Sequence, residues 1–361
     1  MAPEGPGGQR LQGFVCAPTF EEILATELRG LGSLGPRWPA LLTVRAEPPR
    51  GLDPAFCLQP LWDVARVQGR SVSELGRAAV DHLLPELDGG EGPLVLHAYL
   101  PDPRAYASLR GRSQLVAQAF LERLGRVARR VRRRLHFPAE PLTSQPGPLA
   151  ENARLIQLVL VGQGSLLVSA ARPRRLPSGF MDLAPFAGGR PQVATDRTAP
   201  SRAYRKLLEA WAFLDESPQP GQTCVDLGGS PGGWAHTALK RGAKVVAVDR
   251  APLSATLLRH PRLAMVVADA FGYRPPRPVD WLLCDVICTP QRTVDLVGRW
   301  MREGWCRRVV ATIKFKGRTG YDVLAEAARK LATPGWHPPR IKHLPAHQNE
   351  VAILARRKSG D

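Results

Sequence analysis

The stretch Asp226-Leu-Gly-Gly-Ser-Pro-Gly-Gly-Trp234 places four glycines directly after a short apolar segment. Residues 223–227 predict a strand, and the residues from Gly233 to Arg241 predict a helix. Gly228 and Gly229 would let the backbone turn sharply and approach a ligand closely, because glycine has no Cβ. A strand, a tight glycine loop and a helix in this order are typical of a cofactor-binding loop.

Acidic residues stand at the ends of the next three predicted strands, which cover residues 244–249, 263–268 and 279–285. Asp249 could accept hydrogen bonds from the two hydroxyls of an adenosyl ribose. Asp269 is placed to accept a hydrogen bond from an adenine amino group. Asp285 would point toward the methionine end of the ligand. Each aspartate alone could be a loop residue or a helix cap. Together with the glycine loop they favour S-adenosylmethionine as the cofactor.

The main rival for the loop is a site for a nicotinamide dinucleotide. Such a loop would read Gly-x-Gly-x-x-Gly, whereas residues 228–233 read Gly-Gly-Ser-Pro-Gly-Gly. A plain tight turn is the other alternative, and it leaves Asp249 unexplained. The residues predicted to bind the cofactor are Ser201, Gly228, Ser230, Pro231, Gly232, Gly233, Trp234, Asp249, Asp269 and Asp285.

The C-terminal half, from about Ser201, alternates predicted strands and helices. Besides the elements named above, strands are expected at residues 308–315, 340–344 and 350–355, and helices at 291–302 and 321–331. Strands that alternate with helices at this spacing predict an α/β, Rossmann-like domain with a doubly wound, mostly parallel sheet. Ligands of such a sheet bind beyond the carboxyl ends of its strands.

The N-terminal half has a different pattern, typical of an α+β region of ferredoxin-like type. Strands are expected at residues 11–16, 41–46, 94–100, 154–161 and 166–171, and helices at 20–31 and 72–87. A boundary within it is expected between residues 60 and 70. A proline-rich stretch from Pro173 to Pro200 separates this half from the next one and predicts a linker.

The net charge of +18 favours a polyanionic partner, although a basic protein without a nucleic-acid role is the plain alternative. A helix is expected over residues 114–135, with an apolar stripe of Phe120, Leu124, Val127, Val131 and Leu135. Its other faces carry seven arginines between Arg123 and Arg134, which could contact phosphates or could be a solvated face. The residues predicted to contact RNA are Arg126, Arg129, Arg130 and Arg133.

Composition restricts the location of the chain. No apolar run approaches the length that spans a bilayer, and residues 1–10 lack the basic and then apolar pattern of a signal peptide. The six cysteines are scattered, without the paired spacing of a metal site. We therefore expect a cytoplasmic protein with no disulfide, no metal and no membrane partner.

Lysine is rare in this chain, which makes each lysine informative. Of 50 basic residues only eight are lysines, and the first of them is Lys206. Arginine cannot lose its proton in a protein, whereas a buried lysine can do so and act as a base. Lys206, Lys314 and Lys316 therefore stand out as candidates for a chemical role.

These residues resemble those of a known family. Asp-Leu-Gly-x-x-Pro-Gly-Gly-Trp is similar to the cofactor loop of FtsJ-type ribose 2′-O-methyltransferases, and Ser-Arg-Ala-Tyr-Arg-Lys-Leu at 201–207 looks like the segment that carries its first catalytic lysine. The resemblance implies a catalytic tetrad of Lys206, Asp285, Lys314 and Glu350. Lys316 would lie on the same strand face as Lys314 and is a competitor for its role.

Further matches narrow the resemblance, at Ser178-Gly-Phe-Met, Ala199-Pro-Ser-Arg, Gly304-Trp-Cys-Arg and Asn349-Glu-Val. They resemble the members that methylate a cytidine of 23S rRNA in the peptidyl-transferase region and that carry a THUMP-like N-terminal half. This implies a ferredoxin-like subdomain at residues 1–65, a THUMP-like RNA-binding domain at 66–172, a linker at 173–198 and an FtsJ-type methyltransferase domain at 199–358. The partner implied is 23S rRNA, either naked or early in assembly.

The expected chemistry is proton removal followed by methyl transfer. A ribose 2′-hydroxyl is a poor nucleophile, so it needs a positioned base, for which Lys314 is the candidate. A second ammonium on Lys206 would disfavour another positive charge nearby, and Asp285 and Glu350 would orient the two lysines. Methylation of tRNA or another RNA stays open, as does a non-catalytic RNA-binding or ribosome-assembly factor.

Overall fold

The structure is a computed structural model, and it describes residues 10–136, 149–317 and 319–358. The first nine residues, on which part of the signal-peptide argument rests, lie outside this description. Contacts divide the chain into two compact units. The first holds the N-terminal half together with residues 181–190, and the second holds residues 177–180 and 191–361. Residues 173–198 are thus shared between both units, and the predicted domain boundaries stay predictions.

The second unit contains a seven-stranded sheet in the order β12-β11-β10-β13-β14-β16-β15. Strands β12, β11, β10, β13 and β14 run parallel to one another, and β16 is antiparallel to both of its neighbours. This confirms the predicted doubly wound, mostly parallel sheet. The strand bounds are β10 Thr223–Leu227, β11 Lys244–Asp249, β12 Leu263–Val267, β13 Val279–Cys284, β14 Cys306–Lys314, β15 Arg340–Lys342 and β16 Glu350–Arg356.

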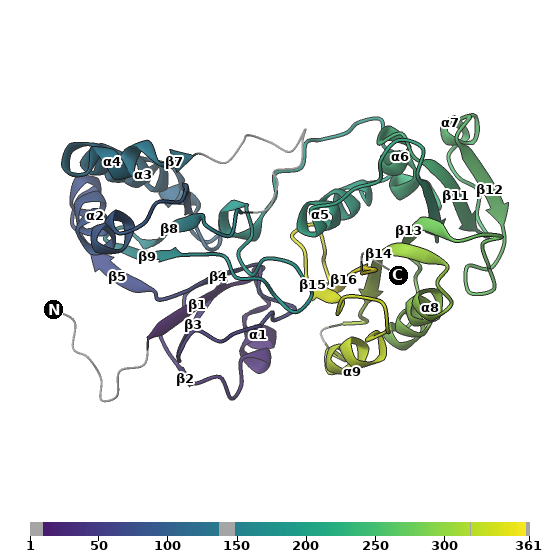
Figure 1. Cartoon of the computed structure of the whole chain (residues 1–361), viewed down its shortest axis with the longest axis horizontal. Helices are drawn as coiled ribbons and strands as arrows, with labels where there is room; N and C mark the ends of the chain where they lie inside the picture. Colours follow the sequence, from purple (N-terminus) through teal and green to yellow (C-terminus); the bar gives the residue numbers. More distant parts are fainter. Residues whose placement is uncertain (1–9, 137–148, 318, 359–361) are drawn as a thin grey trace. The chain divides into compact units, whose positions relative to one another are not determined.

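Helices cover this sheet in two groups (Figure 1). Helix α5 contacts α6, and α8 contacts α9 and β14. Tryptophans fill the core between the layers, since Trp211 and Trp281 meet edge to face at 6.2 Å and Trp300 is fully buried. The helix bounds are α5 Tyr204–Leu214, α6 Gly233–Lys240, α7 Ala255–Leu258, α8 Pro290–Arg302 and α9 Val323–Lys330.

The first unit contains two sheets. The smaller has the order β2-β3-β1-β4, is antiparallel and is accompanied by α1 Glu21–Glu27. The larger has the order β5-β9-β8-β6-β7. The strand bounds are β1 Leu11–Val15, β2 Ser33–Leu34, β3 Leu41–Arg45, β4 Gln59–Leu61, β5 Ala65–Gln68, β6 Leu94–Tyr99, β7 Leu135–His136, β8 Arg154–Gly162 and β9 Ser165–Ala171. The predicted α+β character is confirmed, whereas the THUMP-like assignment stays a prediction.

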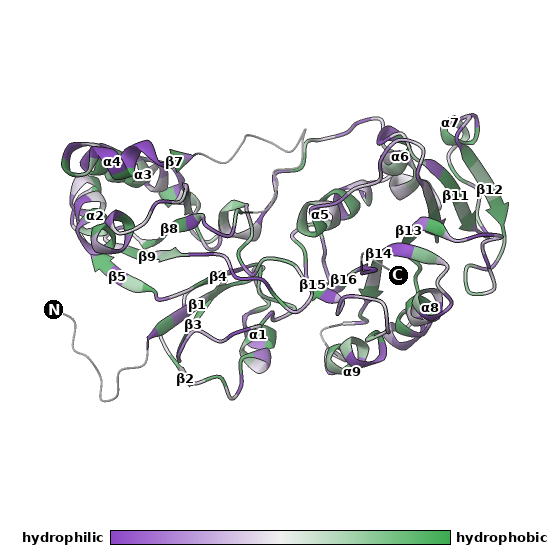
Figure 2. Cartoon of the chain, in the orientation of Figure 1, coloured by the Kyte–Doolittle hydropathy of each residue, from purple (hydrophilic) through white to green (hydrophobic). Residues whose placement is uncertain are grey.

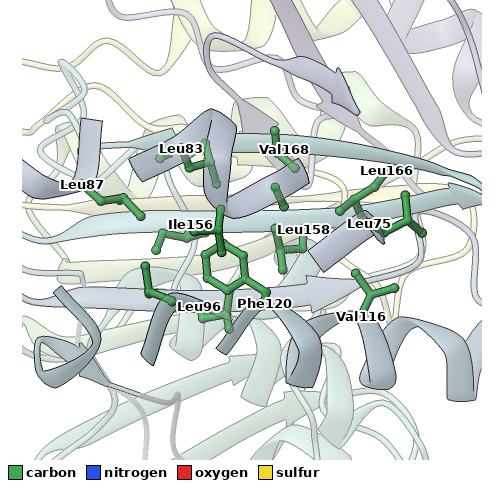
Figure 3. Packing of buried hydrophobic residues seen from close by; sticks show 14 of the residues in the cluster. Leu75, Leu83, Leu87, Leu96, Val116, Phe120, Ile156, Leu158, Leu166 and Val168 are labelled. Atoms are coloured by element: carbon green, nitrogen blue, oxygen red, sulfur yellow. The ribbon is translucent and has the colours of Figure 1, made fainter. Parts of the chain in front are cut away.

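The larger sheet is apolar on both faces. Figure 3 shows Ile156, Leu158 and Leu166 packed against Phe120 and Leu83, the latter two from the helices α3 Arg110–Val127 and α2 Val72–Asp88. Alternate residues of β8, such as Val159, face the smaller sheet and its Leu61. Because successive side chains of a strand point to opposite faces, β8 joins two cores. The two sheets thereby form one compact unit.

The helix predicted over residues 114–135 is in fact two helices, and this prediction was wrong. Helix α3 ends at Val127 and α4 spans Arg129–Arg133, with Ala128 at φ −147° and ψ 68° between them. The break turns Val131 into the core while Val127 stays 42% exposed, so the predicted apolar stripe is interrupted. Leu135 belongs to strand β7, not to a helix.

Arg134 explains why the chain leaves the helix there. Its guanidinium donates to the carbonyl oxygens of Leu87 and Gly92 at 2.8 and 2.9 Å, which anchors the chain for pairing of β7 with β6. Figure 2 shows hydrophilic residues along α4 beside these apolar strands. None of the helices in the described ranges combines the length and the apolar character that crossing a bilayer requires.

Candidate active site

A pocket of about 430 Å³ opens at the carboxyl ends of the parallel strands in the second unit. This is where ligands of doubly wound sheets bind. Residues at or just after the ends of β10, β11, β12, β13 and β14 all line it. The lining residues are Gly228, Ser230, Val248, Asp249, Arg250, Ala268, Asp269, Ala270, Phe271, Asp285, Val286, Ile287, Arg292 and Lys314.

The glycine loop has a backbone conformation that residues other than glycine could adopt only with strain. Gly228 has φ +77°, and a Cβ on it would lie 3.0 Å from the backbone of Val286. Gly232 has φ +115° at the start of α6, and a Cβ there would overlap Leu257. The backbone N–H of Ser230 donates to Asp249 at 3.0 Å. The loop is therefore tied to the end of β11 and lies close against the segment that follows β13.

Asp226 is fully buried beneath this loop at the end of β10. Burial raises the pKa of its carboxyl group to about 8, and the nearby charge of Asp285 and Asp249 acts in the same direction. The backbone N–H of Ala235 opposes this in part. The Asp226 carboxyl group is therefore largely neutral at pH 7, which is unusual for an aspartate.

The two aspartates predicted to hold the adenosine differ in the groups that already donate hydrogen bonds to their carboxylates. Asp249 accepts hydrogen bonds from the backbone of Ser230 and Ala251 and so has a fixed orientation. Asp269 accepts from the backbone N–H of Phe271 and also from Arg250, at 2.7 Å. These hydrogen bonds lower the pKa of the exposed Asp269 carboxyl group. An adenine amino group would have to share that carboxylate with the exposed guanidinium of Arg250.

Four charged side chains converge beside the pocket, and two of them, Asp285 and Lys314, line it. Lys314 Nζ lies 2.9 Å from Asp285 Oδ1 and donates to the Asp285 backbone oxygen at 2.7 Å. Lys206 Nζ lies 2.5 Å from Glu350 Oε1 and 3.7 Å from Asp285 Oδ2. Thr312 Oγ1 donates to Asp285 Oδ1 at 2.5 Å. Asp285 therefore stands between the two lysines, with its carboxylate held from three sides.

The strands explain how residues far apart in sequence meet here. Lys314 is the last residue of β14 and pairs directly with Glu350, the first residue of the antiparallel strand β16. Burial raises the pKa of the Glu350 carboxyl group, although the hydrogen bond from Lys206 opposes this. Behind Glu350 lies His347, which is buried and contacts the Glu350 backbone oxygen through Nδ1. Burial first, and then His343 and Lys206, hold the pKa of His347 well below its usual value, so this ring is neutral.

Several residues predicted to bind the cofactor do not line the pocket. Trp234 is buried, and its indole N–H donates to the backbone oxygen of Ala203 at 2.9 Å. Ser201 packs against Gly233, where a Cβ would lie 2.3 Å from its Oγ. These contacts connect the start of α6 to the segment that carries Lys206. Pro231 and Gly232 also stay outside the lining residues, in the turn before α6.

Three residues that line the pocket were not predicted from the sequence. Arg292 in the first turn of α8 places its guanidinium 3.9 Å from the ring centroid of Phe271. Ile287, in the loop after β13, is 89% exposed beside them. A large apolar residue in the loop after a strand-end aspartate is the one sequence signal that could have pointed to this edge.

Lys316, the predicted competitor of Lys314, does not reach the pocket. Strand β14 ends at Lys314, and Lys316 is exposed in the turn that follows. The backbone N–H of Phe315, between the two lysines, donates a hydrogen bond to the backbone oxygen of Asn349. Lys314 is therefore the only one of these two lysines that lines the pocket.

The four arginines predicted to contact RNA are all exposed in the first unit. Arg126 belongs to the last turn of α3, and Arg129, Arg130 and Arg133 belong to α4. Arg123, by contrast, pairs with Asp81 at 3.2 Å. Within the described ranges, no group of three or more His, Cys, Asp or Glu side chains is arranged to hold a metal ion.

Comparison with known proteins gives a family match in the second unit. Residues 199–310 match the family described as FtsJ-like methyltransferase. This range begins at the segment that carries Lys206 and ends within β14, so it includes the glycine loop and Asp285 but stops before Lys314 and Glu350.

Curated relatives extend the similarity in sequence. The chain is 35% identical over 226 residues to "Ribosomal RNA large subunit methyltransferase M" of Laribacter hongkongensis, which covers 58% of this chain and 61% of that protein. It is 36% identical over 186 residues to the protein of the same name from Halorhodospira halophila, covering 49% and 54%. The chain thus spans about half to three fifths of the length of these relatives.

A search of solved structures gives a distant match. A putative hemolysin from Lactococcus lactis is 19% identical, with a TM-score of 0.36, over 45% of this chain and 90% of that one.

Proposed function

Because residues 199–310 form an FtsJ-like methyltransferase domain, we propose that the chain is an S-adenosylmethionine-dependent RNA ribose 2′-O-methyltransferase. One observation supports this activity in addition to the family match of the domain. Lys314 lies at the rim of the strand-end pocket, 2.9 Å from Asp285, in a network that also holds Lys206 and Glu350. This network offers a base next to a cofactor pocket, which transfer to a hydroxyl group requires.

The pocket fits S-adenosylmethionine in size and in the chemistry of its lining. Its volume of about 430 Å³ lies within the range of small-molecule sites. Asp249 is oriented by two backbone N–H groups and is suited to the ribose hydroxyls, while Asp269 is suited to the adenine amino group. Asp285 also lines the pocket and is the residue proposed to lie nearest the methionine end of the cofactor.

S-adenosylmethionine supplies a methyl group on a sulfonium sulfur, which becomes a neutral thioether when the methyl leaves. Lys314, as the proposed base, would take the proton of the ribose 2′-hydroxyl that receives the methyl group. The ammonium that results is stabilised by Asp285 Oδ1 and by the Asp285 backbone oxygen, and it later releases its proton to solvent. Lys206 stays paired with Glu350 and holds Asp285 in place from the other side.

The finer proposal is that the substrate is a cytidine in the peptidyl-transferase region of 23S rRNA, as naked or early-assembly rRNA. Three observations support it: the names of the curated relatives, the net charge of +18 and the exposed arginines of α3 and α4. A cytoplasmic location follows from such a substrate.

Mass-spectrometric nucleoside analysis of rRNA from cells with and without this chain tests the proposal. We expect the loss of one 2′-O-methylcytidine from 23S rRNA. Loss of a 2′-O-methyl group from tRNA instead would support the broader activity and overturn the rRNA assignment. Unchanged rRNA and tRNA, together with no S-adenosylmethionine binding by isothermal titration, would leave only the non-catalytic RNA-binding factor.

A further inference from the structure

A second recess, of about 320 Å³, lies in the first unit and is rich in arginine. Arg154 at the start of β8 and Arg172 just after β9 line it, together with Arg174 and Arg10. Two carboxylates, Asp63 and Glu86, complete its charged lining. Four guanidinium groups against two carboxylates leave an excess of positive charge in one recess.

Both carboxylates are already committed to other partners. Asp63 pairs with Arg10 at 3.0 Å and also accepts a hydrogen bond from Gln12 at 3.3 Å. Glu86 pairs with Arg154 at 3.2 Å. Neither Arg172 nor Arg174 forms an ion pair with a carboxylate of the described residues. Arg174 donates one long hydrogen bond, of 3.5 Å, to the backbone oxygen of Pro48, and its remaining N–H groups and those of Arg172 are left to bind an anion.

Two of these arginines, Arg154 and Arg174, are held in place before any ligand arrives. The guanidinium of Arg174 lies 5.4 Å from the ring centroid of Trp62, which is itself buried and donates its indole N–H to Asp182 at 2.9 Å. The same carboxylate accepts the backbone N–H of Arg174 at 2.7 Å. Arg154 donates to the backbone oxygen of Ala170 at 3.2 Å. Ordered donors lose little side-chain entropy when they bind, so they favour a defined ligand.

Like charges crowd this recess. Burial lowers the pKa of Arg154, and the positive charges of Arg172 and Arg134 lower it further, while Glu86 opposes them. The guanidinium groups of Arg134 and Arg172 both lie close to Gly90. A Cβ on Gly90 would be 3.4 Å from Arg134 and 3.9 Å from Arg172. A bound anion would relieve this repulsion.

We propose that the recess lined by Arg154, Arg172 and Arg174 binds a phosphodiester group of the RNA backbone. This deepens the proposed function, because it rests on RNA as the partner. Guanidinium groups bind phosphate oxygens in pairs of parallel hydrogen bonds, which suits two adjacent arginines with free donors. Phosphate contacts fix the position of an RNA but do not read its bases. The recess therefore supplies affinity and register, while the choice of nucleotide is made elsewhere.

The test compares RNA binding by the full chain carrying Arg172→Ala and Arg174→Ala with a matched control. Arg29→Ala and Arg50→Ala remove the same charge from two exposed positions of the same unit. Binding of a 23S rRNA fragment is measured by filter retention at several salt concentrations. We expect the recess variant to bind about tenfold more weakly, with a log–log salt slope reduced by about 1, and the control to change much less. Arg172→Gln alone should also weaken RNA binding, and it should not disturb the fold because Arg172 is exposed.

Two results would overturn the proposal. One is equal weakening in the recess variant and the control, which would mean that only net charge matters. The other is binding of inorganic phosphate in the recess that RNA does not displace, which would make it a site for a free anion. None of these measurements needs methyl transfer. Failure of the catalytic proposal, seen as absent activity with normal RNA binding, is therefore distinguishable from failure of this one.

Discussion

Lys314 and Glu350 are direct partners across the antiparallel strands β14 and β16, yet each is paired with a different residue of opposite charge. Lys314 pairs with Asp285, and Glu350 pairs with Lys206. The second contact of Lys206, 3.7 Å from Asp285, links the two pairs. Two positive and two negative charges therefore balance at the rim of the pocket, and removal of any one leaves its partner unmatched.

Replacement of Lys314 by arginine should abolish methyl transfer. Arginine keeps the positive charge but cannot lose its proton at neutral pH, so it cannot serve as the base. We expect the single-turnover rate to fall at least about 100-fold, while the dissociation constant for S-adenosylmethionine changes little.

Lys316→Arg is the matched control, because Lys316 is exposed and does not line the pocket. It should retain the original rate. Transfer by the Lys314→Arg variant at the original rate would remove Lys314 from the role of base.

Replacement of Glu350 by glutamine should cost both stability and activity. The change leaves Lys206, which is only 19% exposed, without its closest carboxylate. Breaking such a largely buried pair costs about 3 kcal/mol, and Lys206 would shift toward Asp285. Urea unfolding measures the first effect and the single-turnover rate the second.

The double variant Lys206→Met, Glu350→Gln separates a structural role from a catalytic one. We expect it to recover most of the stability lost in Glu350→Gln, because Lys206 no longer carries a charge that lacks its partner. The activity should not recover. Recovery of activity together with stability would show that the pair only supports the fold.

Much of the second unit could be predicted from the sequence, because its signals are local. The strand before Gly228 has the predicted bounds, and Asp249 and Asp285 stand at strand ends as expected. Parallel strands bring their carboxyl ends to one edge, so residues placed there in sequence meet in space. The approach of Glu350 to Lys314 depends on the antiparallel insertion of β16, which was not predicted, and only the resemblance implied that the two residues share a site.

The first unit was less predictable, because its details depend on tertiary contacts. The break at Ala128 and the anchoring of Arg134 on two carbonyl oxygens depend on packing that no local pattern encodes. The short strands β2, β4 and β5 were not predicted, since two to four residues carry almost no periodic signal. The arginines of the recess come from distant segments, and only the folded sheets bring them together.

Gly228→Ala should weaken cofactor binding by more than backbone strain alone accounts for. A Cβ at this position would lie 3.0 Å from the backbone of Val286, which lines the pocket, so the loop would have to move. Gly221→Ala is the matched control, because Gly221 also has a positive φ, +86°, but nothing lies within 4 Å of its Cβ position. Isothermal titration with S-adenosylmethionine should show binding by the control and at least tenfold weaker binding by Gly228→Ala. Equal affinities in the two variants would mean that the close approach of the loop to Val286 has no role in the site.

Alanine at Arg126, Arg129, Arg130 and Arg133 together should weaken RNA binding and leave S-adenosylmethionine binding unchanged. All four side chains are exposed on α3 and α4, so their loss should not disturb the core. Each lost phosphate contact should reduce the salt dependence of binding by about 0.9 in log–log slope. An unchanged slope would show that this surface is merely solvated, and RNA contact would then have to lie elsewhere.

Asp226 should make the stability of the chain depend on pH in a direction opposite to that of ordinary aspartates. Its pKa is raised from 3.8 to about 8 in the folded protein, so between these values the folded chain holds a proton that the unfolded chain has lost. Stability from this group is therefore complete below pH 4 and falls as pH rises toward 8, by up to about 1.4 kcal/mol per pH unit. Asp226→Asn cannot ionise, so its urea-unfolding free energy should decline less between pH 5.5 and pH 8 than that of the original chain. Glu209, whose pKa burial also raises to about 8, contributes with the same sign in both proteins and cancels in the comparison. If the two proteins lost stability in parallel over this range, Asp226 would have to be ionised in the folded chain, with a partner that offsets its burial.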